Sequence, residues 1–224
     1  MPEAWLRSGM ALVFDMDGVI VDSNPLHVKA WTLYNQRLGI DAGESLARRM
    51  YGGRNDEIVR DFFGSHLSAE EVAAHGAAKE ELFRELLAPG LAEALVPGVQ
   101  EFLERHAGQR IGLATNAEPP NVDFVLDRGG LRQYFQVIVD GHQVHYPKPH
   151  PEIYLRAAQL LGVEPRNCIV FEDSPPGIQA ARAAGARIVG LRTTQRELPE
   201  ADLAIDDFLS PELEPWLRAQ TQGT

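Results

Sequence analysis

The stretch Leu12-Val-Phe-Asp-Met-Asp-Gly18 decides the fold that we predict for this chain. Three apolar residues in a row indicate a strand that is buried on both faces. Gly18 then allows a turn that most side chains would not tolerate. Asp15 and Asp17 therefore stand at the carboxyl end of a strand, where open α/β sheets bind their ligands. Two neighbouring acids repel each other unless a cation or a shared proton is present, so we predict a reaction centre here.

Short apolar runs recur along the chain, and a polar or glycine-marked turn follows each of them. The runs stand at residues 11–14, 111–114, 137–139, 169–171, 188–191 and, more weakly, 203–205. Helical stretches at residues 99–106, 121–127, 152–161 and 177–184 separate most of them. Strands that alternate with helices predict an α/β fold, in which helices cover both faces of a parallel sheet.

The segment from residue 26 to residue 93 breaks this alternation, because it has helical periodicity and no convincing strand. We expect helices around residues 28–38 and 58–63, a third that opens at the capping box Ser68-Ala-Glu-Glu71, and a fourth over residues 79–87. This pattern predicts a helical cap at residues 26–93, inserted into a core made of residues 1–25 and 94–224. Such a cap can close over the acidic pair and exclude water. The polar residues 219–224 are expected to be loose.

The composition excludes several classes of partner. A net charge of −11 argues against binding to nucleic acid or to an anionic membrane surface. The single cysteine, Cys168, lies in a buried strand pattern typical of a core thiol, and it favours a reducing compartment. We find no apolar stretch of membrane-helix length and no secretory signal, so we expect a cytoplasmic protein. We expect a monomer or a weak homodimer, although the sequence does not fix the oligomeric state.

Polar residues follow four of the predicted strands, each at the point where the strand ends. They are Asp15 with Asp17, Thr115 with Asn116, Lys148 beyond the third strand, and Glu172 with Asp173. Each of these, taken alone, has a structural alternative, such as a helix cap, a solvated loop cation or a polar turn. Because the carboxyl ends of parallel strands meet at one edge of a sheet, we expect these side chains to meet there.

Such a group of residues suits phosphoryl transfer with Mg²⁺. Carboxylates from Asp15, Glu172 and Asp173, with the backbone carbonyl of Asp17, would form the hard oxygen site that Mg²⁺ prefers. The ion and Lys148 would neutralise a phosphate dianion. The Thr115 hydroxyl and the amides near Asn116 would hold the equatorial phosphate oxygens.

The two aspartates would divide the chemistry between them. Asp15 would attack phosphorus and form an aspartyl-phosphate. Asp17 would protonate the leaving oxygen and later take a proton from the incoming water or hydroxyl. That task needs a raised pKa, which we expect a neighbouring carboxylate and a closed cap to supply to Asp17.

Four motifs resemble the signature motifs of the haloacid dehalogenase superfamily. They are Phe-Asp-Met-Asp-Gly at 14–18, Ala-Thr-Asn at 114–116, Lys-Pro-His-Pro at 148–151 and Phe-Glu-Asp-Ser-Pro-Pro-Gly at 171–177. The chain is similar to the subfamily with a helical cap, which holds β-phosphoglucomutase and many sugar-phosphate phosphatases. This resemblance implies a Rossmann-like core, Mg²⁺ dependence and an aspartyl-phosphate intermediate.

The resemblance also implies roles for three residues of the cap. His27 stands where β-phosphoglucomutase has a histidine that tunes the acid/base aspartate. Arg54 resembles the cap arginine that grips a distal phosphate, and Lys79 resembles a cap lysine near the sugar. The structural alternatives are an ordinary helix-face histidine for His27 and a solvated helix face for Lys79. We expect the histidines around Lys148 to be loop residues, with His145 at most a neighbour of the substrate.

Two reactions of the superfamily fit this sequence poorly. A halide leaves without a proton, so dehalogenation has no use for Asp17. Phosphonate hydrolysis uses a cap lysine as a Schiff base, whereas the corresponding loop here carries Gly52-Gly53-Arg54, and an arginine cannot do that chemistry.

We therefore expect a Mg²⁺-dependent phosphatase that acts on a small phosphomonoester, with a sugar phosphate as the favoured class. The first alternative is a phosphomutase of the β-phosphoglucomutase type, which shares every core residue. The segment Thr115-Asn116-Ala117 is more similar to the phosphatases than to the Ser-Ala-Ser of that mutase. The second alternative is a non-catalytic regulatory module that binds Mg²⁺ and accepts phosphate, although such a module has no need of a lid.

Overall fold

The parallel sheet predicted from the sequence is confirmed by a computed structural model, which describes residues 9–40 and 55–222. Its strands are β1 (Ala11–Phe14), β2 (Arg110–Ala114), β3 (Val137–Val139), β4 (Cys168–Glu172), β5 (Arg187–Leu191) and β6 (Leu203–Ile205). They lie in the order β3-β2-β1-β4-β5-β6, and every neighbouring pair is parallel. This is the order of a doubly wound Rossmann-like sheet, whose ligands bind where the order reverses beside β1.

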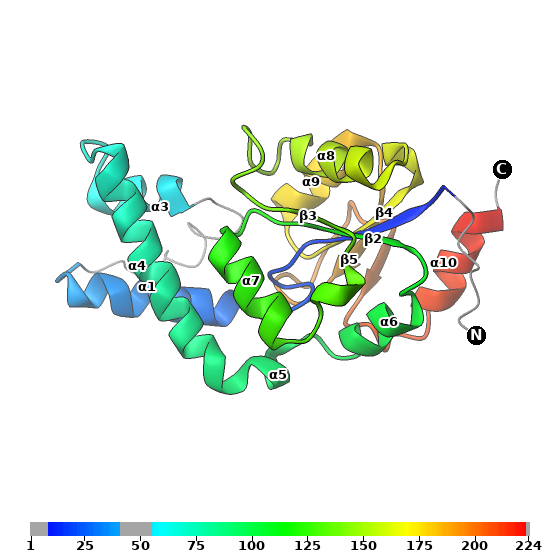
Figure 1. The fold of residues 1–224 in the computed structure, drawn as a ribbon, viewed down its shortest axis with the longest axis horizontal. Coiled ribbons are helices and arrows are strands. Elements are labelled where there is room, and N and C mark those ends of the chain that lie inside the picture. Colours follow the sequence, from blue (N-terminus) through cyan, green and yellow to red (C-terminus); the bar gives the residue numbers. More distant parts are fainter. Residues whose placement is uncertain (1–8, 41–54, 223–224) are drawn as a thin grey trace.

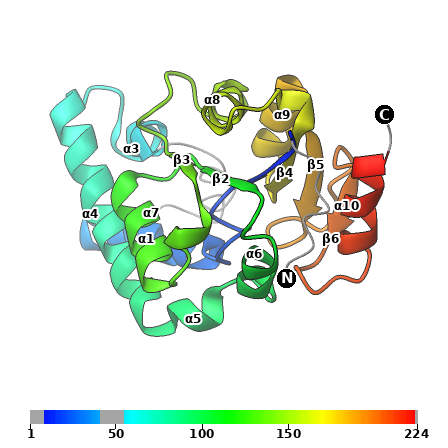
Figure 2. The ribbon, with the colours of Figure 1, turned by 45° about the vertical axis from the view of Figure 1, so that its right-hand side comes forward.

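Helices cover both faces of the sheet (Figures 1 and 2). One face packs against α8 (Glu152–Leu161) and α9 (Pro175–Ala184). The other shares an apolar core with α6 (Val99–Arg105), α7 (Pro119–Arg128) and α10 (Leu213–Gln222). Alternate residues of β1 serve the two cores: Val13 faces α8 and α9, whereas Phe14 stacks on Phe171 of β4 with ring centroids 4.5 Å apart. A strand buried on both faces explains the unbroken apolar run of the sequence.

The helical insert lies between β1 and β2 in the chain and gathers at one end of the molecule (Figure 1). It contains α1 (Asn24–Arg37), α3 (Asn55–Phe63) and α4 (Ala69–Leu87), which bury a small core of their own around Trp31 and Val59. The chain returns through a 3-10 turn (Ala88–Gly90) and α5 (Leu91–Ala94). The outgoing and returning connections are joined by hydrogen bonds, such as that from Asp22 N to Ala94 O at 2.7 Å.

Two expectations about helices are wrong. The helices expected from Ser68 onward and over residues 79–87 are one continuous helix, α4. Gly76, the weakest helix former between them, is tolerated because α4 packs closely there: a Cβ on Gly76 would lie 3.4 Å from the Asn55 Cβ. Residues 219–222 are not loose but form the last turn of α10, which is anchored by the buried Leu213 and Leu217.

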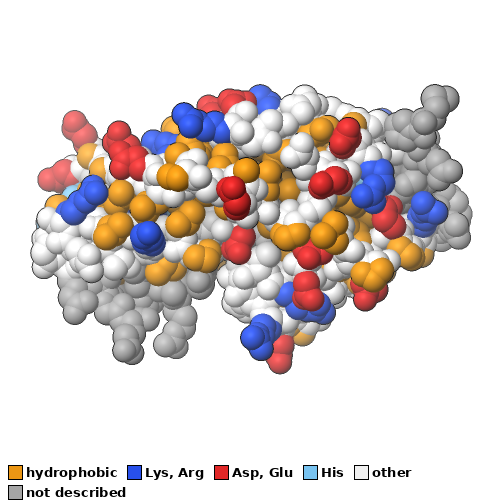
Figure 3. All heavy atoms as spheres, turned by 90° about the horizontal axis from the view of Figure 1, so that it is seen from below, with side chains coloured by type: hydrophobic (Ala, Val, Ile, Leu, Met, Phe, Trp, Pro, Cys, Tyr) orange, Lys and Arg blue, Asp and Glu red, His pale blue; other side chains and the backbone are white. Residues whose placement is uncertain are grey.

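The remaining elements are two further 3-10 turns, at Arg132–Tyr134 and Pro165–Asn167. None of the helices in the described parts of the chain combines the length and apolar character that a membrane crossing requires. On the face shown in Figure 3, acidic and basic side chains lie interspersed rather than gathered by sign.

Candidate active site

A cavity of about 400 Å³ opens at the carboxyl edge of the sheet, between the core and the helical insert. Eight of the predicted site residues line it: Asp15, Asp17, His27, Lys79, Thr115, Asn116, Lys148 and Asp173. A ninth, Glu172, is fully buried and in contact with Lys148. The tenth, Arg54, lies outside the described residues.

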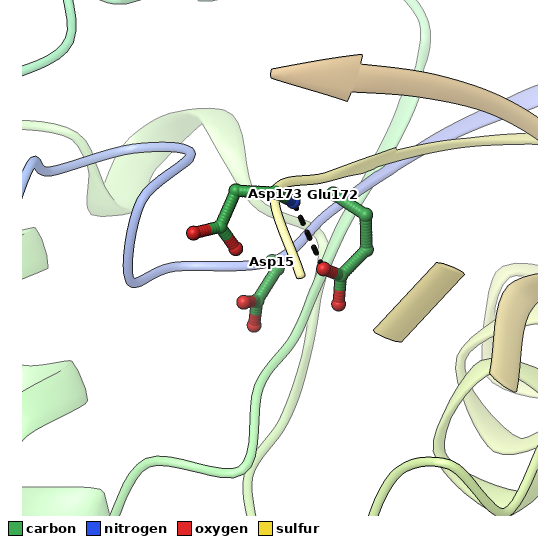
Figure 4. Close-up of side chains that lie close together, drawn as sticks. All are labelled: Asp15, Glu172 and Asp173. Atoms are coloured by element: carbon green, nitrogen blue, oxygen red, sulfur yellow. Dashed lines mark hydrogen bonds between the residues drawn. The ribbon is translucent and has the colours of Figure 1, made fainter. Parts of the chain in front are cut away.

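Three carboxylates converge at the floor of the cavity (Figure 4). One oxygen from each of Asp15, Glu172 and Asp173 lies within 4.8 Å of the others, and all three residues are buried. Lys148 Nζ lies 2.9 Å from Asp15 Oδ1 and 2.7 Å from Glu172 Oε1. A single ammonium does not neutralise three carboxylates, so this cluster suits an additional divalent cation.

Glu172 already has a full set of hydrogen-bond donors. Its Oε1 accepts from Lys148 Nζ and from the hydroxyl of Tyr154, both at 2.7 Å. Its Oε2 accepts from Asp173 N at 2.9 Å (the dashed line in Figure 4), from Ser174 N at 3.1 Å and from Ser174 Oγ at 3.0 Å. Glu172 therefore holds the lysine and the β4–α9 turn in place.

Two glycines allow the backbone to approach these carboxylates. Gly18 has φ +78°, as the turn after β1 requires, and a Cβ there would lie 1.9 Å from Asp173 Oδ2. A Cβ on Gly177, in the first turn of α9, would lie 1.7 Å from Glu172 Oε1. Neither position has room for a side chain while the carboxylates keep their places.

The environment changes the proton affinity of each group in the cluster. Burial raises the pKa of Asp15 to about 7, although the ammonium of Lys148 opposes this change. Burial and the charge of Glu172 raise the pKa of Asp173 well above its usual value. Burial also acts on Glu172, but Lys148 and the hydrogen bonds outweigh it and lower the Glu172 pKa. Two carboxylates keep the pKa of Lys148 above its usual value despite its burial.

The pKa of Asp17 differs from our expectation. Its Oδ1 accepts a hydrogen bond from Ser23 Oγ at 2.5 Å and lies 3.3 Å from His27 Nε2. Burial would raise the pKa of Asp17, but His27 and the Ser23 hydroxyl outweigh it, so the pKa is lowered rather than raised. The neighbouring carboxylates have less influence than these two direct contacts.

Lys79 is buried, with 2% of its surface exposed, so the alternative of a solvated helix face is wrong. Its Nζ lies 3.1 Å from His27 Nδ1 and 2.6 Å from Glu80 Oε1. The His27 ring stacks on Phe83 with centroids 3.7 Å apart. These contacts form a chain from Asp17 through His27 and Lys79 to Glu80, deep in the insert.

Thr115 and Asn116 lie in the loop after β2, as the sequence predicts. The Thr115 hydroxyl accepts a hydrogen bond from Ala117 N at 3.1 Å, and this residue is 1% exposed. Asn116 Oδ1 lies 3.5 Å from Lys148 N. Of the histidines near Lys148, His142 lines the cavity, whereas the exposed His145 contacts Glu152.

Sequence reasoning missed several residues that support the site. Asn24 Nδ2 donates to Asp173 Oδ2 at 3.1 Å, and Thr194 Oγ1 donates to the same oxygen. Thr194 follows the strand predicted at 188–191, so it could have been found by looking for polar residues just beyond each predicted strand. Asn24 and Tyr154 stand inside helices and give no comparable signal.

Comparison with known proteins agrees with this geometry. A model of the haloacid dehalogenase-like hydrolase family matches residues 10–185. The chain belongs to this family.

The hydrolase is similar to characterised relatives along most of its length. It is 37% identical over 188 residues to the phosphorylated carbohydrates phosphatase of Thermotoga maritima, an alignment that covers 81% of this chain and 84% of the relative. It is 33% identical over 183 residues to the fructose-1-phosphate phosphatase YqaB of Escherichia coli K12, covering 81% and 95%. The crystal structure of β-phosphoglucomutase from Clostridium difficile matches with a TM-score of 0.83 at 28% identity, covering 95% of this chain and 98% of that one.

Proposed function

We propose that this hydrolase is a Mg²⁺-dependent phosphatase that cleaves a small sugar phosphate through an aspartyl-phosphate on Asp15. The observation that carries the proposal is the meeting of Asp15, Lys148 and Asp173 beneath one cavity, from three separate strand ends. Two of the relatives named above, a fructose-1-phosphate phosphatase and a phosphorylated carbohydrates phosphatase, support the substrate class.

The residues present fit a magnesium ion. Asp15 Oδ1 is buried and accepts no hydrogen bond from the described residues, apart from its ion contact with Lys148. We assign direct coordination to Asp15 and Asp173, with the Asp17 carbonyl as a third ligand. Glu172, whose oxygens are already saturated, contributes its charge and positions Lys148. When bound, Mg²⁺ supplies positive charge that stabilises the phosphate oxygens.

The chain's own groups then bind and orient the phosphate. Lys148 supplies one positive charge at the floor of the cavity. The Thr115 hydroxyl and the amides after Asn116 hold the equatorial oxygens. We assign the insert to residues 26–93 and the core to residues 1–25 and 94–224. The insert closes over the site and excludes water.

The reaction has two displacements at phosphorus. A carboxylate oxygen of Asp15 attacks, the bond from phosphorus to the sugar oxygen breaks, and Asp17 donates its proton to that leaving oxygen. Asp17, now ionised, takes a proton from water as the water attacks the aspartyl-phosphate, which releases inorganic phosphate and restores Asp15. His27, 3.3 Å from Asp17, orients this carboxyl group. Because His27 and Ser23 also lower the pKa of Asp17 in this structure, Asp17 must take up a proton when the substrate binds before it can act as the acid.

The proposal is tested by phosphate release from a panel of some tens of phosphorylated metabolites, with Asp15→Asn as the blank. We expect one group of sugar phosphates to be hydrolysed, with the activity lost in Asp15→Asn and in excess EDTA. Turnover that persists in either condition would contradict the proposal. No Mg²⁺-dependent turnover of any phosphoester would favour the regulatory module.

A phosphomutase is the second candidate, and the close structural match to β-phosphoglucomutase favours it. The two activities share the core residues and differ in the acceptor, which is water or a sugar hydroxyl. The test supplies β-glucose 1-phosphate with a bisphosphate primer. Glucose 6-phosphate that forms faster than free phosphate would identify the mutase.

A further inference from the structure

We infer that Glu118 is a specificity-determining residue, which selects a hydroxyl-bearing leaving group without charge and rejects one that carries a second phosphate. This inference rests on the phosphatase function proposed above and narrows its substrate class to sugar monophosphates. It follows from where Glu118 lies, what it contacts and which charges surround it.

Glu118 is placed on the leaving-group side of the cavity. It is the N-cap residue of α7, but its side chain makes no capping hydrogen bond and instead lines the cavity. Its Oε1 accepts a hydrogen bond at 2.8 Å from Asn55 Nδ2, at the start of α3. A Cβ on Gly76 of α4 would lie 3.7 Å from the same oxygen. The carboxylate thus faces the helical insert, whereas the phosphate end of the cavity is defined by Asp15 and Lys148 at the sheet edge.

The charge of Glu118 is not balanced by a described cation. Asn55 Nδ2 also donates to Glu80 Oε1 at 2.7 Å, so one amide group serves two carboxylates. Glu80 is paired with Lys79 at 2.6 Å, but Glu118 forms no ion pair with any residue that the structure describes. Its Oε2 likewise receives no hydrogen bond from those residues.

Among the described residues, the lysine and the arginine that line this side of the cavity are Lys79 and Arg60. The ammonium of Lys79 is neutralised by Glu80, whereas Arg60 donates from Nη1 to the uncharged carbonyl of Leu67 at 2.9 Å and keeps its positive charge. A second phosphate placed beside Glu118 would meet an unpaired carboxylate and suffer like-charge repulsion. A sugar hydroxyl would instead donate a hydrogen bond to Glu118 and satisfy its free acceptor.

The experiment compares matched pairs of substrates that share the ester to be cleaved. The pairs are fructose 1-phosphate with fructose 1,6-bisphosphate, and glucose 1-phosphate with glucose 1,6-bisphosphate. The quantity measured is the ratio of kcat/KM for the monophosphate to kcat/KM for the bisphosphate. We expect a ratio of at least about tenfold for the unaltered protein, because like charges brought together in a closed site repel strongly.

Substitutions at Glu118 should reduce that ratio. Glu118→Gln removes the charge and keeps the shape, and should lower the ratio about fivefold or more; Glu118→Lys should lower it further. The matched control is Glu101→Gln, an exposed acid of α6 that does not line the cavity, which should leave the ratio unchanged. Inhibition of monophosphate hydrolysis by the bisphosphate, measured on the unaltered protein, gives a second readout that needs no variant.

The outcomes separate this inference from the function on which it rests. A ratio near one in the unaltered protein, or a ratio that Glu118→Gln changes less than about twofold, would overturn the role of Glu118 alone. A preference for bisphosphates that Arg54→Ala removes would overturn it in favour of a distal phosphate site at Arg54. Failure to release phosphate from all four sugars and from p-nitrophenyl phosphate would overturn the proposed phosphatase, and this inference with it.

Discussion

At the scale of single residues, the candidate site depends on Glu172, a carboxylate that positions other side chains and does not itself need to contact a ligand. Glu172 is fully buried, and burying a charge is costly unless partners satisfy it. Lys148, Tyr154 and the turn at Ser174 supply those partners. Because Lys148 also contacts Asp15, any change in the position of Glu172 is passed on to the group that we propose as the nucleophile.

Tyr154→Phe tests this dependence by removing one donor and leaving the ring in place. We expect the free energy of unfolding to fall by about 1–2 kcal/mol, because a buried carboxylate oxygen loses a hydrogen bond. We also expect kcat to fall about tenfold and the Mg²⁺ requirement to rise, because Lys148 and Asp15 lose their orientation. Urea denaturation and a magnesium titration measure these effects. Tyr146→Phe, at a tyrosine that is 61% exposed, is the control. Equal behaviour of the two variants would refute the positioning role.

The residues at the strand ends were predictable, because the carboxyl ends of parallel strands converge whatever the loops do. The contacts between those residues were not. The lowered pKa of Asp17 depends on how His27 and Ser23 are turned toward it, which no spacing reveals. Glu118 and Asn55 meet only when the insert is placed over the core, so the sequence gives no signal for that pair.

At the scale of elements, the site depends on how closely α9 approaches the end of β4. Helix α9 begins at Pro175 with Ser174 as its N-cap, whose hydroxyl accepts from Gly177 N at 3.2 Å. Gly177 is the residue that lets the first turn of the helix pass directly over Glu172.

Gly177→Ala should therefore damage both stability and activity. The added methyl group must push Glu172 aside, at a cost of about 1–3 kcal/mol in unfolding free energy. Displacement of Lys148 by the same movement should lower kcat/KM by about 100-fold. Gly108→Ala is the matched control, since a Cβ there meets nothing within 4 Å, and it should behave like the unaltered protein. Thermal unfolding and phosphate release measure the pair. Full activity in Gly177→Ala would mean that Glu172 is not held as we describe.

The types of the core elements that were predicted followed from their apolar periods, because strands buried on both faces and helices with one apolar stripe have different periods. Within the insert the same reasoning divided α4 into two helices, whereas the structure shows one helix that runs through Gly76, a residue of low helix propensity. The close packing of Gly76 against Asn55, which overrides that propensity, is a tertiary effect. The whole of α10 was missed, and the burial of its anchors Leu213 and Leu217 is likewise a tertiary effect.

At the scale of the whole molecule, a buried polar network joins the insert to the core. Asn121 of α7 donates to Glu80 Oε2 at 2.7 Å and accepts from Arg84 at 2.7 Å. Asn55 adds the link to Glu118 on the other side of Glu80. Glu80 thus contacts both Asn121 of the core and Asn55 of the insert.

The ionisation of Glu80 should make the polar network between the insert and the core sensitive to acid. Burial would raise the pKa of Glu80, but Lys79, His27 and the hydrogen bonds lower it from 4.5 to about 2. A lowered pKa stabilises the folded state fully above the unfolded value and loses that contribution as the pH falls toward the folded value. The ionised Glu80 should contribute about 3 kcal/mol to the free energy of unfolding at pH 6, and about 2 kcal/mol of this contribution should be lost between pH 6 and pH 3. Urea denaturation of the unaltered protein and Glu80→Gln at both pH values measures this. The difference in unfolding free energy between the two proteins should be smaller at pH 3 than at pH 6. An equal difference at both pH values would contradict the role assigned to Glu80.

The central claim is that Asp15 carries the phosphoryl group in a magnesium-dependent reaction. The most direct measurement incubates the protein with radiolabelled acetyl phosphate, quenches it in acid and maps the label to a peptide. We predict a hydroxylamine-labile label on Asp15 that requires Mg²⁺ and is absent from Asp15→Asn. Release of phosphate with no label on Asp15, or with the label on another residue, would contradict the account.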